Sequence, residues 1–145
     1  FDIIFTSPPY FNVERYSHDD TQSWIRYKDI DGWNTRFLQK ALDNMLPTLR
    51  SGGKLCINIS DVYANSKWSS DRCWLKICDP MNEFLDEYRD MEYIGCIGME
   101  MAKRPNSGGA GTAKDTTQYS EESLKLAEET KDKRFCEPIW IWEKK

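Results

Sequence analysis

Hydrophobic and polar positions in the N-terminal part of the chain predict a strand, a helix and a second strand. The apolar run at 3–5 predicts a short buried strand over residues 2–6. Between residues 33 and 49, apolar side chains recur about every fourth position, which predicts an amphipathic helix. The glycines of 51–53 end that helix, and residues 54–60 predict a second, central strand. This order is typical of a βαβ unit, so we expect a parallel sheet with a right-handed crossover.

The segment between the first strand and the helix is longer than most loops. Residues 11–32 are polar but rich in aromatic side chains, and a loop of this length is usually functional or contains a short helix. We expect it either to cover a pocket or to pack its aromatic rings on the core. Asp31 and Asn34 are both candidate caps for the helix that follows, and Pro47 is expected to tighten its last turn.

The second half of the chain predicts one more helix and two more strands. Residues 64–76 are mostly polar, and we interpret them as irregular. Asp79 and the proline after it suit the N-cap and the first turn of a helix. Apolar residues over 91–102 and 135–143 predict a third and a fourth strand.

Residues 103–134 differ in composition from the rest of the chain. Their glycine-rich start is typical of flexible segments, and residues 120–131 suggest a short helix with Ser120 as its cap. Their apolar content is too low for a core. We therefore expect a flexible insertion loop within a single domain that spans residues 1–145.

Composition and charge limit the class of protein. The chain has 145 residues, a net charge of −4 and a pI of about 5.1, which argues against a free-standing nucleic-acid-binding module with a basic surface. No apolar run approaches the ~20 residues of a membrane span. The five cysteines lack paired spacing and His18 is the single histidine, so we expect reduced thiols, no bound metal and a cytoplasmic location. The absence of an initiating methionine and of a leader suggests a fragment of a longer protein.

The first strand ends in the motif Thr6-Ser7-Pro8-Pro9-Tyr10. Two consecutive prolines cannot continue a strand ladder, because neither has an N–H to donate. A hydroxyl, a fixed proline carbonyl and an aromatic ring therefore leave the strand together at its carboxyl end, where ligands bind in open α/β sheets. The motif predicts a binding site at this point, and a plain proline turn after a core strand is the alternative interpretation.

This segment resembles the catalytic motif of the amino-methyltransferases, which modify exocyclic amino groups of DNA bases. That motif has Asp, Asn or Ser, then Pro-Pro and an aromatic residue. The helix–Gly-Gly–strand order that follows is also similar to the family. The resemblance implies an α/β fold with a partial Rossmann-like methyltransferase sheet. In that sheet, a parallel βαβ unit is joined to a C-terminal antiparallel hairpin, with flanking helices.

The resemblance also implies S-adenosylmethionine-dependent methyl transfer and a role for each motif residue. Ser7 Oγ and the Pro8 carbonyl would accept hydrogen bonds from the amino group of a base flipped out of duplex DNA. Pro9 would stiffen the turn, and Tyr10 would stack on the base. In the family, Ser-Pro-Pro-Tyr is typical of enzymes that form N4-methylcytosine, so cytosine is favoured over adenine N6. An RNA amino-methyltransferase is an alternative. The implied setting is restriction-modification in a prokaryotic or virus-host cytosol.

Candidate DNA contacts lie on both sides of the predicted insertion loop and next to the motif. Phe11 directly follows Tyr10, and a basic segment before the last strand resembles one that contacts DNA in related enzymes. The alternative for the charged residues is a solvated charge run, because four glutamates dilute the patch. The candidate nucleic-acid residues are Phe11, Lys103, Arg104, Lys133 and Arg134.

The cofactor-binding residues of the family are mostly missing from the sequence. The glycine-rich Phe-x-Gly-x-Gly turn is absent, which leaves Thr6 and Asp61 as candidate cofactor contacts at the predicted rim. We therefore expect the catalytic half of a longer enzyme, inactive by itself. Its exposed sheet edge should pair with the missing half or with a second copy. A non-catalytic fragment that serves as a binding or assembly module is the alternative.

Overall fold

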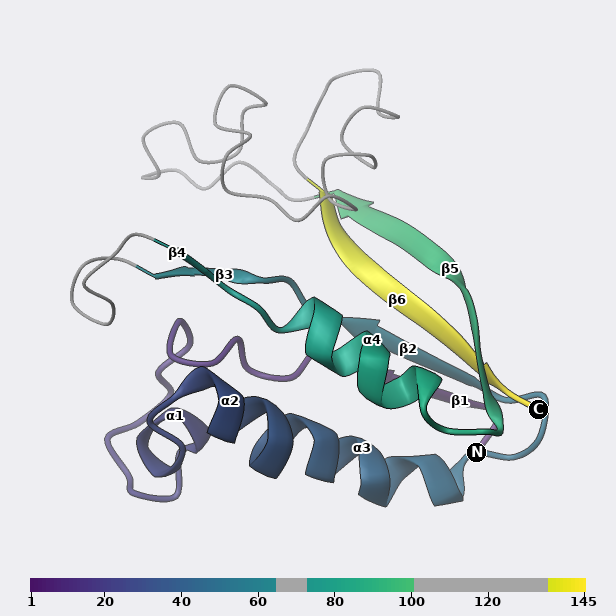
Figure 1. Ribbon diagram of the computed structural model, residues 1–145, viewed down its shortest axis with the longest axis horizontal. Coiled ribbons are helices and arrows are strands. Elements are labelled where there is room, and N and C mark those ends of the chain that lie inside the picture. Colours follow the sequence, from purple (N-terminus) through teal and green to yellow (C-terminus); the bar gives the residue numbers. More distant parts are fainter. Residues whose placement is uncertain (65–72, 101–135) are drawn as a thin grey trace.

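The computed structural model describes residues 1–64, 73–100 and 136–145, which form an α/β arrangement around a four-stranded sheet (Figure 1). The predicted insertion loop, residues 103–134, lies outside the described residues. In the described part of the chain, no helix has the length and apolar character needed to cross a lipid bilayer.

The sheet has the strand order β1-β2-β6-β5. Strand β1 (Ile3–Thr6) is parallel to β2 (Lys54–Asn58), whereas β6 (Cys136–Lys144) is antiparallel to both β2 and β5 (Met91–Glu100). The predicted parallel unit and C-terminal antiparallel hairpin are therefore confirmed. The carboxyl ends of β1 and β2 lie on the same edge of the sheet as the start of β6, and we call this edge the rim.

The connection from β1 to β2 is helical over most of its length. A short helix α1 (Ser23–Arg26) lies within the long polar segment. It is followed by an uninterrupted helical run, whose consecutive parts are α2 (Ile30–Trp33), the π-helical η1 (Asn34–Leu38), α3 (Gln39–Met45) and the 3₁₀ turn η2 (Leu46–Thr48). The π turn lets Trp33 and Leu38, which are five positions apart, both be buried.

The start of this helical run differs from the prediction. Asp29, rather than Asp31 or Asn34, is the cap, because its carboxylate accepts a hydrogen bond from the Gly32 N–H at 2.6 Å. Asn34 is buried inside the run and donates from its side chain to the Lys76 carbonyl at 2.9 Å. Pro47 does lie in the tightened last turn, as predicted.

The segment after β2 is more ordered than the sequence indicates. Strands β3 (Val62–Ala64) and β4 (Cys73–Leu75) form an antiparallel pair, and β4 lies within residues 64–76, which were predicted to be irregular. Helix α4 (Cys78–Asp86) then begins without a cap from its own N-cap residue, Ile77. Asp79, the predicted cap, lies inside the first turn instead, and the carboxylate of Asp61 accepts the hydrogen bonds of the helix start.

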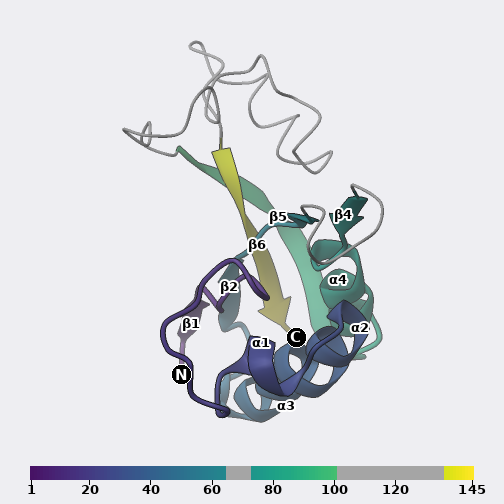
Figure 2. The ribbon, with the colours of Figure 1, turned by 90° about the vertical axis from the view of Figure 1, so that its left-hand side faces the viewer.

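The helices lie together on one side of the sheet, which we call the covered face (Figure 2). Leu55 and Ile57 of β2 point to this face and are fully buried. The opposite side, the open face, keeps Ile3, Phe5 and Ile97 between 54% and 64% exposed. The buried core includes Trp33, Leu38, Leu42, Leu49, Leu55, Ile57, Met81, Leu85, Trp140 and Trp142.

Candidate active site

Ser7 lies at the rim directly beyond the end of β1, and its hydroxyl contacts the neighbouring strand. The Ser7 hydroxyl donates to Asn58 Oδ1 at 3.5 Å, and Asn58 is the last residue of β2. The Asn58 side-chain amide donates in turn to the Pro138 carbonyl of β6 at 3.2 Å. Asn58 is only 4% exposed, whereas Ser7 is exposed. Strand β6, which is antiparallel to β2, thus holds the Asn58 amide, and Asn58 in turn contacts the exposed Ser7 hydroxyl at the rim.

The Pro-Pro turn is held by several backbone hydrogen bonds. The Phe11 N–H donates to the Pro9 carbonyl at 3.0 Å, and the Val13 N–H donates to the Tyr10 carbonyl at 2.9 Å. The Tyr10 N–H donates to a carboxylate oxygen of Glu14 at 3.1 Å. Ser7 Oγ and the Pro8 carbonyl are two neighbouring hydrogen-bond acceptors on this rigid turn.

Tyr10 is held at its far end as well as at its backbone. Its hydroxyl donates to Glu137 Oε2 at 2.9 Å, which ties the motif to the start of β6. Burial of the ring, together with the nearby Glu137 carboxylate, raises the pKa of Tyr10 well above its usual value. The phenol is therefore a neutral hydrogen-bond donor at any physiological pH. The half-buried ring is fixed beside the turn rather than free to rotate.

Phe11, a predicted nucleic-acid contact, lies in the core. It is 4% exposed and packs edge-to-face on Trp33, with ring centroids 6.0 Å apart. Its φ of +46° is in the left-handed region, which costs an aromatic residue on the order of 1–3 kcal/mol. Burial of the ring offsets this strain and fixes the backbone directly after Tyr10. In this arrangement the ring is not available to a base, so its function is to anchor the motif.

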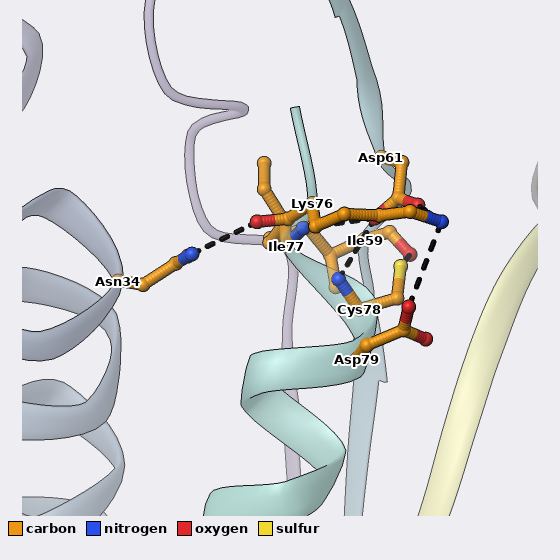
Figure 3. A network of polar contacts seen from close by, with 7 residues as sticks. All are labelled: Asn34, Ile59, Asp61, Lys76, Ile77, Cys78 and Asp79. Atoms are coloured by element: carbon orange, nitrogen blue, oxygen red, sulfur yellow. Dashed lines mark hydrogen bonds and ion pairs between the residues drawn. The ribbon is translucent and has the colours of Figure 1, made fainter. Parts of the chain in front are cut away.

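Asp61 lies at the rim beyond β2, as predicted, but its carboxylate has partners inside the chain (Figure 3). One oxygen accepts hydrogen bonds from the backbone N–H groups of Ile77 and Cys78, both at 2.9 Å. The other oxygen is 3.1 Å from Lys76 Nζ, which also lies 3.5 Å from Asp79. The predicted cofactor contact of Asp61 stays untested, and the structure gives this residue a different task, which is to hold the start of α4.

The same network explains two shifted pKa values, those of Lys76 and Cys78. The hydrogen bond to Asp61, with the charges of Asp61 and Asp79, raises the pKa of Lys76, so the ammonium stays charged. Burial, reinforced by the Asp61 charge, raises the pKa of the Cys78 thiol well above its usual value. Cys78 Sγ lies 3.5 Å from the Ile59 carbonyl. The thiol is therefore a structural group and not a nucleophile at neutral pH.

Of the remaining predicted site residues, one lies at the rim and four lie outside the residues that the structure describes. Thr6 is the last residue of β1, is partly buried and pairs with Ile57. The four basic residues proposed to contact DNA lie outside the described residues, so their arrangement is untested. They are Lys103, Arg104, Lys133 and Arg134.

Two supporting residues, Asn58 and Glu137, could not be recognised as site residues before the structure was known. The period-2 pattern of the strand over 54–60 places Asn58 near its end, but nothing local indicates that its amide faces Ser7. Glu137 is separated from Tyr10 by 127 positions. The signal that they share is a polar residue at the rim end of an otherwise apolar strand.

These features define a class of site: a rigid turn at the carboxyl end of a parallel strand, with two adjacent acceptors and a fixed aromatic ring. Such a site is suited to a planar ligand that carries an amino group. A family model described as DNA methylase (N6_N4_Mtase) matches residues 1–145. The chain therefore belongs to the N6/N4 DNA methylase family, and the predicted resemblance is confirmed. Neither a curated protein nor a solved structure gives a significant match.

Proposed function

We propose that this chain forms the catalytic part of an S-adenosylmethionine-dependent DNA amino-methyltransferase of Rossmann-like fold, acting on a flipped base. Its membership of the DNA methylase family supports methyl transfer to DNA. The observation that carries the assignment to an amino group is the pairing of Ser7 Oγ with the neighbouring Pro8 carbonyl on the rigid turn. Both are acceptors, which is what the two N–H groups of an exocyclic amine require.

The proposed chemistry is a direct displacement. When bound, S-adenosylmethionine would supply the methyl group, and its transfer to the amino nitrogen would be balanced by cleavage of the donor's carbon–sulfur bond and by loss of one amino proton to water. Hydrogen bonds to Ser7 Oγ and the Pro8 carbonyl would draw the two amino hydrogens out of the plane of the base and so free the nitrogen lone pair from conjugation with the ring. Tyr10 would stack on the base, a contact worth ~1–3 kcal/mol. Its bond to Glu137 holds the ring in a single orientation.

The contacts that Thr6 and Asp61 would make with the methyl donor stay proposals, and these two residues would form only part of its site. Both oxygens of Asp61 have internal partners, and the sequence contains no Phe-x-Gly-x-Gly turn. We propose that residues outside this stretch complete the cofactor site and that the isolated chain is inactive. The outer edge of β1, with Ile3 and Phe5 exposed, is our proposed contact for that missing part or for a second copy.

The serine in the first position favours cytosine N4 over adenine N6, by analogy with the family. DNA as substrate would place the protein in the cytosol of a prokaryote or of a virus-infected host. A non-catalytic role and an RNA substrate are the competing hypotheses, and both are outcomes of the following test.

The test is methyl transfer from labelled S-adenosylmethionine to unmethylated duplex DNA by the full-length protein, with RNA as competitor. We expect Ser7→Ala to lower kcat by about 10²-fold or more with little change in the unfolding midpoint. Ser51→Ala, an exposed serine far from the rim, is the matched control and should keep full activity. Mass spectrometry of the digested DNA identifies N4-methylcytosine or N6-methyladenine. Three results would refute the proposal: no methyl transfer to DNA, full activity of Ser7→Ala, or methylation of the RNA competitor in place of the DNA.

A further inference from the structure

The side chain of Asn58 has one possible orientation in its surroundings. Its N–H group faces the Pro138 carbonyl, which has lone pairs only and must accept. Its Oδ1 atom therefore faces Ser7. Because Asn58 is 4% exposed, water does not compete freely for either contact.

This orientation decides what the Ser7 hydroxyl can do. An amide oxygen only accepts, so the single hydroxyl proton of Ser7 must point to Asn58. Both lone pairs of Ser7 Oγ then remain for N–H donors from a ligand. The 3.5 Å separation is long for a hydrogen bond, and contacts of this kind shorten when a catalytic site closes around its substrate.

A free hydroxyl at this position would have a second, unproductive option. It could rotate and donate its proton to the amino nitrogen of the base. That hydrogen bond would occupy the lone pair that has to attack the methyl group. Ser7 alone thus supplies an acceptor only part of the time, and an aspartate at the same position would not have this difficulty because an ionised carboxylate has no proton to donate.

We propose that Asn58 is a positioning residue for methyl transfer, which holds the Ser7 hydroxyl proton away from the substrate and keeps Ser7 Oγ as an acceptor. Pro138 fixes the orientation of the Asn58 amide, so the start of β6 contributes to the chemistry without contacting the base. This proposal rests on the proposed function and adds a residue that acts only through Ser7.

A double-mutant cycle in the full-length protein tests the proposal. Asn58→Ala should lower kcat by about 10-fold to 10²-fold while the KM for DNA stays unchanged, because binding of the base does not involve Asn58. In the Ser7→Ala background, Asn58→Ala should cause no further loss. Asn82→Ala is the matched control, since the Asn82 amide oxygen also accepts a partly buried hydrogen bond, from Trp142 at 3.2 Å, but lies far from Ser7. It should lower kcat in neither background.

The result that overturns the proposal is an equal loss of kcat from Asn58→Ala with and without Ser7, since a merely structural role would act in both backgrounds. The proposed function fails separately if Ser7→Ala alone keeps full activity. Should Asn58→Ala not fold, Asn58→Asp replaces it in the cycle. A protonated aspartate can donate to Pro138 and accept from Ser7, so its kcat relative to wild type should rise as the pH falls. That rise must vanish in the Ser7→Ala background, and its persistence there contradicts the proposal.

Discussion

The covered face of the sheet is sealed by helices, whereas the open face leaves large apolar side chains in solvent. On the covered face, Leu55 and Ile57 have no exposed surface. On the open face, Ile3 and Phe5 of the edge strand are more than half exposed. A monomer rarely leaves neighbouring apolar side chains so exposed without a partner for them.

The two faces also differ in what they contribute to the site. Alternation along β2 puts Asn58 on the side of the open face, and Ser7 follows Phe5 by two positions on the same side. The covered face supplies the anchors, such as Phe11 on Trp33 and Asp61 at the start of α4. The covered face thus mainly stabilises the fold, whereas the open face holds the residues proposed to act in catalysis. Substitutions on each face can therefore test stability and activity separately.

The largest expected effect separates the two faces by stability. Leu55→Ala removes a fully buried side chain and should lower the free energy of unfolding by about 2–5 kcal/mol. Ile3→Ala removes a similar side chain that is 64% exposed, and should change it by less than about 0.5 kcal/mol. Urea denaturation of both variants gives the comparison. A loss at Ile3 as large as that at Leu55 would show that the open face is covered in solution.

Features encoded by neighbouring residues were predicted from the sequence, whereas features that depend on contacts in the folded chain were not. The strands, the helix starting near residue 33 and the Pro-Pro turn follow from periodicity and from proline chemistry, and they were predicted within a few residues. Asp29 was missed as a cap because Asp31 and Asn34 are equally suitable residue types close by, and only the backbone shows that Asp29 reaches Gly32. The β3–β4 pair was missed because strands this short carry almost no periodic signal.

The candidate site shows the same division. Residues 7–10 were recognisable because their chemistry lies within one contiguous turn. The partners Asn58 and Glu137 come from β2 and β6, and their contacts depend on the register between strands, which no local pattern encodes. Phe11 was misjudged for a related reason: an aromatic residue after the motif serves equally well as a base contact or as a core anchor until its burial is known.

An intermediate effect is expected at Asp61, which links the rim to the covered face. Asp61→Ala leaves two buried N–H groups of the α4 start without their acceptor and removes the partner of Lys76. The free energy of unfolding should fall by about 2–3 kcal/mol. Asp61→Asn keeps one carbonyl oxygen and should lose about half as much.

Asp79→Asn is the matched control for this site. Asp79 also contacts Lys76, but its carboxylate is 65% exposed, so the change should cost less than about 0.5 kcal/mol. Thermal unfolding of the three variants ranks them. Equal losses at Asp61 and Asp79 would mean that the charge near Lys76, rather than the capping of α4, stabilises this region.

The smallest effect concerns a contact on the covered face between the segment that follows α4 and the helix α3. The hydroxyl of Tyr88, just beyond the end of α4, donates to Asp43 of α3, and this hydrogen bond, with a smaller contribution from burial, raises the pKa of Tyr88 to about 12. Because the folded pKa lies above the ordinary value of about 10, the stabilisation is complete below pH 10 and disappears as the pH rises to about 12. Tyr88→Phe should therefore lower the free energy of unfolding by up to about 1 kcal/mol at pH 8, and by almost nothing at pH 12.

The measurement is urea denaturation of wild type and Tyr88→Phe at intervals between pH 8 and pH 12. Their difference isolates Tyr88 from Tyr10 and Cys78, whose raised pKa values weaken both proteins equally as the pH rises. The same pair of measurements in an Asp43→Asn background should show a smaller difference, because the charge that holds the phenol proton is gone. A Tyr88→Phe difference that stays constant through pH 12 would show that Tyr88 stabilises the helix pair by packing on Phe84, at a ring distance of 5.3 Å, and not through Asp43.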